Sequence, residues 1–337
     1  MSLDPKILEE YKTAKEKGAL IDFGFREKIR VDGKDRASFL HRMLTNDIEG
    51  LKPGEGCYAC FLSVQAKVIA DMIVFVSENH ITLDVMPGLS KKIIDSLGKF
   101  VITDDVTFKE VTASRCDFVV LGPKSEDLIR ALTKEYPKKN YSHQKVMITP
   151  TLPSPTSGEG KGGGLPCIFI YLDLFGAKAW AILSDKQNEN SLRTALEKSS
   201  FKFLNSDTIN ILRVESGMPF YGIDFDENTI ILEAGLDSAV SFTKGCYPGQ
   251  EIVARMDSRA KFAKKLAYIL MEGTGVPKSG DRITKDGKEI GKVTSAVFSP
   301  KFNQPLALGF IARDYLVPKT EIQIEVQKGS VLSDIKS

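Results

Sequence analysis

The stretch of this sequence that says most about the fold is Lys244-Gly245-Cys246-Tyr247-Pro248-Gly249-Gln250-Glu251. Its glycines and proline predict a tight, irregular backbone around a single thiol. Residues 251–255 continue with a helical pattern, so Cys246 should lie just before the N-terminus of a helix that Gln250 opens. There the helix dipole and the nearby Lys244 would favour the thiolate. Cys246 is therefore a candidate functional thiol, and the alternative is a buried cysteine that packs as a small hydrophobic residue.

Outward from this segment, Asp71 interrupts the apolar run Val68–Val76. Apolar side chains on both sides of this predicted strand indicate that both of its faces are buried. An ionised carboxylate there would cost roughly several kcal/mol unless it were paired or hydrogen-bonded. Asp71 is thus either the structural partner of an Arg or Lys or a site carboxylate, and these residues alone favour neither.

A second carboxylate, Glu215, falls in the last turn of a predicted helix at 208–216, which Asp207 should cap and Gly217 should end. A carboxylate in that turn opposes the helix dipole at a cost of about a few tenths of a kcal/mol. Arg213 is two residues away on a different helix face and is not an automatic partner. These residues alone favour an exposed Glu215.

Metal and redox sites are less well supported. Cys57 and Cys60 match a C-x-x-C pattern, but no second pair completes a zinc site, and a strand would point their sulfurs to opposite sides. We interpret both as packing residues. The three histidines, His41, His80 and His143, show no ligand spacing.

The composition argues against a nucleic-acid-binding, membrane-spanning or secreted protein. The 46 Lys and Arg nearly balance the 44 Asp and Glu, so no global charge favours nucleic acid. No run of about 18 apolar residues is present to span a membrane. Residues 1–17 are charged and lack the apolar core of a signal peptide. Five cysteines do not form a disulfide framework, so we expect a cytoplasmic protein.

The domain organisation follows from length and pattern. A chain of 337 residues is too long for one ordinary core. Helical patterns at 35–44 and 90–97 flank a strand-rich region at 56–83. The Pro-, Ser- and Gly-rich stretch at 148–166 is expected to be an exposed, mobile loop. Short strands separated by turns predict a closed β-structure at 262–337.

These features together resemble the YgfZ/GcvT family over almost the whole chain. Residues 244–251 match the YgfZ signature K-G-C-Y-x-G-Q-E in full. Residues 39–54 are similar to the opening helix and turn of the family, and residues 213–224 to its R-x-E-x-G and Y-G-x-D block. Residues 290–300 resemble its barrel domain.

The resemblance implies a GcvT-like arrangement of three domains around a central channel that holds folate. Residues 1–258 would form the folate-binding region, as two interleaved α+β subdomains, and residues 262–337 the C-terminal β-barrel. The implied cofactor is tetrahydrofolate or a derivative.

The resemblance also implies roles for particular residues. Asp71 falls where the family keeps an aspartate beside the reactive nitrogen of folate, Tyr58 where a tyrosine lines the pocket, and Glu215 where a glutamate reads the pterin ring. A carboxylate can accept two hydrogen bonds from the pterin amino and ring N–H groups. We therefore predict Cys246 and Asp71 as catalytic residues, and Glu215, Tyr58, Asp71 and Lys244 as folate-binding residues.

Three departures separate this chain from the T-protein branch of the family. Residues 171–176 replace a TGYTGE-like segment, the asparagine that follows the strand ending at residues 83–85 is missing, and T-proteins have no cysteine at the position of Cys246. One position also departs from the YgfZ pattern, since Ala66 replaces its usual glycine. On balance the sequence favours the YgfZ-type branch.

The favoured prediction is a folate-binding YgfZ-type protein that supports assembly or repair of iron–sulfur enzymes, with Cys246 as its thiol. Its partners would be folate and iron–sulfur enzymes or assembly proteins, with no direct nucleic acid or membrane contact and only an indirect effect on tRNA modification. The alternative is an aminomethyltransferase that moves a one-carbon unit from a lipoyl carrier to tetrahydrofolate, with Asp71 acting on the folate nitrogen. A third possibility is a non-catalytic scaffold that signals folate occupancy.

Overall fold

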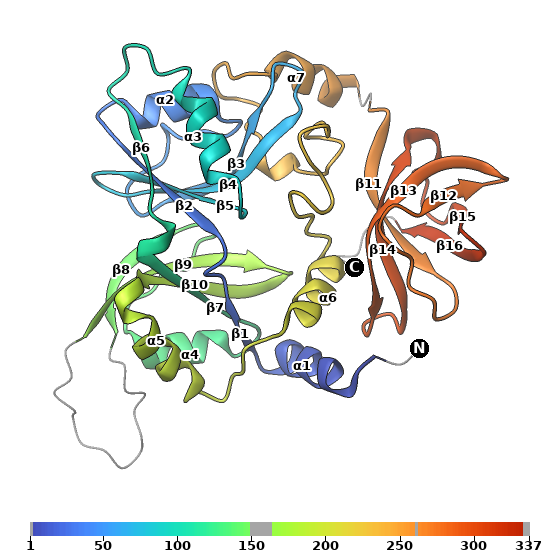
Figure 1. Cartoon of the computed structure of the whole chain (residues 1–337), viewed down its shortest axis with the longest axis horizontal. Helices are drawn as coiled ribbons and strands as arrows, with labels where there is room; N and C mark the ends of the chain where they lie inside the picture. Colours follow the sequence, from blue (N-terminus) through green and yellow to red (C-terminus); the bar gives the residue numbers. More distant parts are fainter. Residues whose placement is uncertain (1–2, 149–163, 260–261, 333–337) are drawn as a thin grey trace. The chain divides into compact units, whose positions relative to one another are not determined.

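The computed structural model describes residues 3–148, 164–259 and 262–332 (Figure 1). The chain divides into two compact units. Unit 1 takes the described parts of 1–9, 61–70 and 205–337, and unit 2 takes 10–60 and 71–204. Helix α1 (Pro5–Glu16) crosses the first boundary. Four short 3-10 helices complete the connections: η1 (Thr112–Ser114), η2 (Lys186–Asn188), η3 (Asp237–Ala239) and η4 (Arg313–Tyr315).

The first sheet of unit 2 is antiparallel and has the order β3-β4-β5-β2-β6. Its strands are β2 (Glu27–Asp32), β3 (Gly56–Leu62), β4 (Val68–Val76), β5 (Ile81–Val85) and β6 (Thr107–Glu110). Alternation along the strands puts Ile29, Val74 and Leu83 on one buried face. Helices α2 (Arg36–Met43) and α3 (Ser90–Gly98) lie over this sheet (Figure 1). The predicted strands and helices of this region are confirmed.

The second sheet of unit 2 has the order β1-β7-β10-β9-β8. Its strands are β1 (Ala19–Asp22), β7 (Arg115–Leu121), β8 (His143–Ile148), β9 (Leu165–Leu174) and β10 (Ala177–Asp185). Phe118, Phe169 and Trp180 form the centre of an apolar layer beneath helices α4 (Ser125–Leu132) and α5 (Glu189–Glu197). Both helices lie on the side of this sheet away from the first sheet (Figure 1).

A charged layer lies between the two sheets of unit 2. Lys28 of β2 is 2% exposed and its Nζ atom lies 3.1 Å from Asp84 of β5 and 3.0 Å from Asp117 of β7. Because side chains alternate along a strand, the apolar residues of each sheet face its helices and these charged residues face the other sheet. The inner faces of unit 2 are therefore held together partly by buried ion pairs.

Unit 1 contains α6 (Ser206–Ser216), α7 (Gln250–Arg259) and a closed barrel of order β11-β14-β13-β12-β15-β16. Its strands are β11 (Lys264–Met271), β12 (Arg282–Lys285), β13 (Lys288–Ser299), β14 (Gln304–Ala312), β15 (Glu321–Ile324) and β16 (Gln327–Leu332). Ile269, Ile283 and Ile311 are fully buried inside it. The predicted α+β fold with a C-terminal β-barrel is confirmed, whereas the domain bounds 1–258 and 262–337 and the central channel stay predictions.

Helix α6 packs on the barrel through a buried hydrogen-bond hub at Asp224. Its Oδ2 atom accepts from Arg213 of α6 and from the backbone N–H of Phe220, and its Oδ1 atom accepts from Thr294 and Ser295 of β13. Arg213 also donates to Asn210 of its own helix, but its charge partner is Asp224, which lies beyond the end of that helix. A buried guanidinium needs such an opposite charge.

Local details differ from the sequence predictions. Asn205 caps α6 through its side chain, which accepts from the N–H of Thr208, whereas Asp207 lies in the first turn. Glu215 is 4% exposed, so the expectation of an exposed glutamate is wrong. The predicted loop at 148–166 begins with the last residue of β8 and ends in β9, and its residues 149–163 lie outside the described part of the chain. No described helix is long and apolar enough to cross a membrane.

Candidate active site

Asp71 occupies the middle of β4 with only one of its carboxylate oxygens satisfied. The Tyr58 hydroxyl of the neighbouring strand β3 donates to Oδ2 at 2.8 Å. The other oxygen, Oδ1, is buried and has no hydrogen-bond partner among the described residues. A buried acceptor without a partner is destabilising, which makes Asp71 Oδ1 a candidate acceptor for an external donor. Asp117 Oδ1 and His143 Nδ1 are also buried without a partner among the described residues.

Burial and neighbouring charges shift the pKa values of both residues of this pair. Burial raises the pKa of Asp71, while the Arg26 charge and the Tyr58 hydrogen bond lower it, and the pKa stays above its usual value. Burial and the Asp71 charge raise the pKa of Tyr58 well above its usual value. Tyr58 therefore remains a hydroxyl donor at neutral pH, and its proton helps to orient the carboxylate.

The charged layer beside Asp71 was not found from the sequence. Arg26 donates from Nε to Asp84 Oδ1 at 2.5 Å, and Lys28 joins Asp84 to Asp117. Burial acts to raise the pKa of Asp84, but the Arg26 and Lys28 charges outweigh it and hold that pKa below its usual value. The sequence pattern that singled out Asp71, a charged residue within an apolar strand, would also have singled out Asp84 in Ile81–Val85.

Glu215 lies in the last turn of α6 in unit 1. Its Oε1 atom accepts from the Ser299 hydroxyl at the end of β13 and from the backbone N–H of Lys301 at 3.1 Å. These two donors offset the unfavourable interaction of the carboxylate with the helix C-terminus.

The segment 244–251 packs closely against the turn between β3 and β4. Gly249 has φ +80°, and a Cβ atom there would lie 2.7 Å from the Ser63 carbonyl oxygen and 2.9 Å from Ala66 Cα. Cys246 is exposed, which contradicts the alternative of a buried packing cysteine. Lys244 lies 5.0 Å from the Tyr247 ring, and burial raises the pKa of Tyr247 to about 12.

The predicted site residues therefore fall into two groups. Asp71 and Tyr58 contact each other in unit 2, whereas Glu215, Lys244 and Cys246 belong to unit 1. Cys57 and Cys60 are both buried, as expected of packing residues. Among the described residues no group of three or more His, Cys, Asp or Glu could hold a metal ion.

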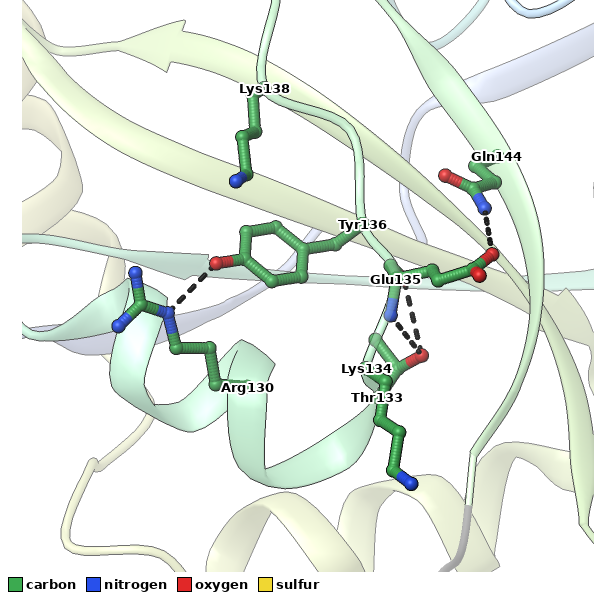
Figure 2. A pocket seen from close by; sticks show the side chains of 7 residues that line it. All are labelled: Arg130, Thr133, Lys134, Glu135, Tyr136, Lys138 and Gln144. Atoms are coloured by element: carbon green, nitrogen blue, oxygen red, sulfur yellow. Dashed lines mark hydrogen bonds between the residues drawn. The ribbon is translucent and has the colours of Figure 1, made fainter.

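One surface pocket of unit 2 is formed by the end of α4, the chain after it and β8. Figure 2 shows its lining: the Tyr136 hydroxyl accepts from Arg130 Nε, and Gln144 donates to Glu135. None of the predicted site residues lines this pocket, and several of its polar groups bond one another. It is therefore not part of the candidate site.

Comparison with known families covers nearly the whole chain. Residues 1–244 match the GCVT N-terminal domain, and residues 264–335 match the glycine cleavage T-protein C-terminal barrel domain. This chain belongs to the glycine cleavage T-protein (GCVT) family. Membership of this family agrees with the predicted GcvT-like resemblance, while placement in its YgfZ-type branch stays a prediction.

Several relatives of this GCVT-family protein are named aminomethyltransferases. Those of Caldanaerobacter subterraneus and Oceanobacillus iheyensis are 26% and 27% identical, over 95% and 96% of this chain and 84% and 86% of their own. A putative chloroplastic transferase of Arabidopsis thaliana is 30% identical over 87% of this chain, which spans only 65% of that relative.

Solved structures support the fold. The crystal structure of glycine cleavage system aminomethyltransferase T from Bartonella henselae is 20% identical, with a TM-score of 0.83 over 97% of this chain and 88% of that one. The names of the relatives agree better with the alternative prediction, a transferase, than with the favoured iron–sulfur maintenance role.

Proposed function

We propose that this GCVT-family protein is a tetrahydrofolate-dependent transferase that moves a one-carbon unit from an aminomethyl group on a lipoyl carrier. The proposal is supported by relatives named aminomethyltransferase along nearly the full chain. The observation that carries it is Asp71, a buried carboxylate with one oxygen bonded to Tyr58 and the other without a hydrogen-bond partner in the residues that the structure describes.

These residues fit a reduced folate because its ring carries N–H donors. When bound, tetrahydrofolate would supply the nitrogen atoms that take up the one-carbon unit. Asp71 Oδ1 would accept a hydrogen bond from one such N–H group, and its charge would stabilise positive charge that develops there during transfer. Tyr58 would hold the Asp71 carboxylate in one orientation through Oδ2.

The transfer can be measured directly in a single-turnover assay with aminomethylated lipoyl carrier protein and tetrahydrofolate. We expect release of ammonia and formation of methylene-tetrahydrofolate. Asp71→Asn should lower the transfer rate by about 10²–10⁴-fold, the usual contribution of a positioned acid–base group. Its folate affinity, measured by calorimetry, should change far less.

Asp185→Asn is the matched control, since it removes a carboxylate of the same unit from a partly exposed pair with Arg115. It should leave the rate unchanged. If the unsubstituted protein binds tetrahydrofolate but releases no ammonia, the transferase proposal fails. Equal losses of transfer rate and folate affinity in Asp71→Asn would show that Asp71 only binds folate and does not act in the transfer.

A second candidate function rests on Cys246. Its exposure within a segment that matches the YgfZ signature in full supports a thiol-dependent role in maintaining iron–sulfur enzymes. On this reading Cys246→Ala should abolish complementation of a strain that lacks its own homologue. Any transfer to tetrahydrofolate that the unsubstituted protein shows should be unchanged in this variant. Full complementation by folded Cys246→Ala would remove this candidate.

A further inference from the structure

Arg26 and Asp71 lie in one cross-strand row of the first sheet of unit 2. Val85 is the register partner of Met72 on β4 and of Glu27 on β2. One position further out, Asp71 and Arg26 therefore flank Met86. Side chains in one such row project from the same face of the sheet.

Arg26 is held beside Asp71 without bonding it. Its Nε and Nη2 atoms donate to Asp84, at 2.5 Å to Oδ1 and 3.2 Å to the carbonyl oxygen, and Nη1 lies 3.1 Å from Met86 Sδ. No direct ion pair joins Arg26 to Asp71 among the described residues. The guanidinium thus brings a positive charge to this row, while the buried Asp71 Oδ1 has no hydrogen-bond partner among the described residues.

A second cation, Lys28, binds the other carboxylate oxygen of Asp84. Lys28 Nζ contacts the other oxygen of Asp84 at 3.1 Å and Asp117 at 3.0 Å, and its side chain is 3% exposed. Asp84 is therefore bonded on both oxygens by cations, which fixes the direction in which Arg26 extends. Lys28 lies two residues along β2 from Arg26, in the row of Asp84 and Ile73 rather than that of Asp71.

We propose that Arg26 is a positioning residue for the transfer reaction: held by Asp84 beside Met86, its guanidinium supplies the positive charge that keeps the buried Asp71 carboxylate ionised without taking up the hydrogen-bonding capacity of Oδ1. This role rests on the proposed function of Asp71. A direct Arg–Asp pair would give more stabilisation but would occupy the oxygen that the ligand needs. A charge one side chain away still acts strongly because a dry interior screens it weakly.

The titratable groups around Asp71 are few. Tyr58 and Cys60 approach from β3, Arg26 from the residue before β2, and Asp84 from β5. Burial raises the pKa of Asp71 and Asp84 adds to this effect, whereas Arg26 is the cation that opposes it. Removal of Arg26 should therefore move the titration of Asp71 to higher pH.

The first test measures Asp71 itself and needs no turnover. In carboxyl ¹³C NMR, the Asp71 signal is assigned by its loss in Asp71→Asn and followed against pH. Arg26→Met should raise its midpoint by about one pH unit or more, the usual effect of losing a nearby opposite charge. Arg26→Lys should raise it less, because the charge is retained.

Arg30→Met is the control, since it removes another cation from β2, one that pairs with Asp32 rather than with Asp84. Its Asp71 midpoint should stay near that of the unsubstituted protein. Should Arg26→Met not fold, Arg26→Gln provides the same comparison. An unchanged midpoint in the Arg26 variants, or an equal shift in Arg30→Met, would overturn the proposal.

The second test follows the reaction. The acid limb of the kcat/KM profile should move to higher pH in Arg26→Met by the same amount as the NMR midpoint. At a pH below that limb this gives a loss of about tenfold that is recovered at higher pH. If the unsubstituted protein has no transferase activity, the proposed function fails but the NMR result still decides whether Arg26 controls the Asp71 charge. A loss of rate that is equal at every pH would contradict a role in ionisation.

Discussion

A buried, ionised Asp71 would serve a functional site but lowers the stability of the folded protein. Its folded pKa lies above the usual aspartate value because burial outweighs Arg26 and Tyr58. A carboxylate with a raised folded pKa destabilises the folded state at pH above that pKa, and this effect vanishes as the pH falls to the unfolded value. For Asp84 the sign is opposite, because Arg26 and Lys28 hold its pKa below the usual value.

Asparagine substitutions at these two positions should therefore act in opposite directions. At pH 8, Asp71→Asn should raise the free energy of unfolding by about 0.5–2 kcal/mol, as relief of a strained functional site commonly does. Asp84→Asn should lower it by about 3–5 kcal/mol, because Arg26 and Lys28 lose their shared partner. Urea unfolding at pH 8, 6 and 4 measures both.

The gain in Asp71→Asn should shrink as the pH falls through its raised folded pKa. The loss in Asp84→Asn should fade only below about pH 4, where Asp84 becomes protonated in the unfolded chain before it does in the folded protein. A destabilised Asp71→Asn at pH 8 would show that this carboxylate is a structural partner instead of a site residue.

At the scale of elements, the turn between β3 and β4 and the segment before α7 fit together through two unusual backbone conformations. Ala66 has φ +60° and is fully buried, and Gly249 has φ +80° directly against it. An L-residue in the left-handed region costs about 1–2 kcal/mol. Ala66, where the YgfZ pattern has glycine, therefore carries strain that a glycine would not.

Exchanging small residues at these positions tests the fit. Gly249→Ala should lower the free energy of unfolding by about 1–3 kcal/mol, because its methyl group would meet the Ser63 carbonyl as well as an unfavourable φ. Ala66→Gly should be neutral or stabilising by up to about 1 kcal/mol. Chemical denaturation of both variants provides the measurement, and similar losses in the two would argue against this packing.

At the scale of the whole molecule, Asp224 connects α6, the chain that follows it and β13 of the barrel. Four hydrogen bonds reach this one buried carboxylate. Asp224→Asn should destabilise the protein by about 3–5 kcal/mol, since it leaves the buried Arg213 without its charge partner.

A surface pair in the same barrel supplies the control for Asp224. Glu289→Gln removes a partly exposed contact with Arg282 and should change stability by less than about 1 kcal/mol. Thermal unfolding of both variants gives the comparison. Equal stability of Asp224→Asn and the unsubstituted protein would show that the hydrogen bonds of Asp224 do not stabilise unit 1.

Much of the fold could be predicted because its signals are local. A continuous apolar run predicted the strand around Asp71, and short strands separated by turns predicted the closed barrel. Gln250 opens α7, as the helical pattern of residues 251–255 suggested. Helix caps were less predictable, since Asn205 and Asp207 are both good capping residues and only the backbone geometry selects Asn205.

The sequence by itself determined that a charged residue, Asp71, lies in a buried strand and that a thiol, Cys246, lies in a constrained segment before a helix. Only the tertiary structure decided what surrounds Asp71: Tyr58 on one oxygen, no hydrogen-bond partner for the other within the described part of the chain, and Arg26 held at a distance by Asp84. The physical reason is that burial and side-chain periodicity can be read along the chain, whereas ion pairs between strands far apart in sequence depend on the register that folding sets. The burial of Glu215 has the same origin, because its donors come from the end of β13.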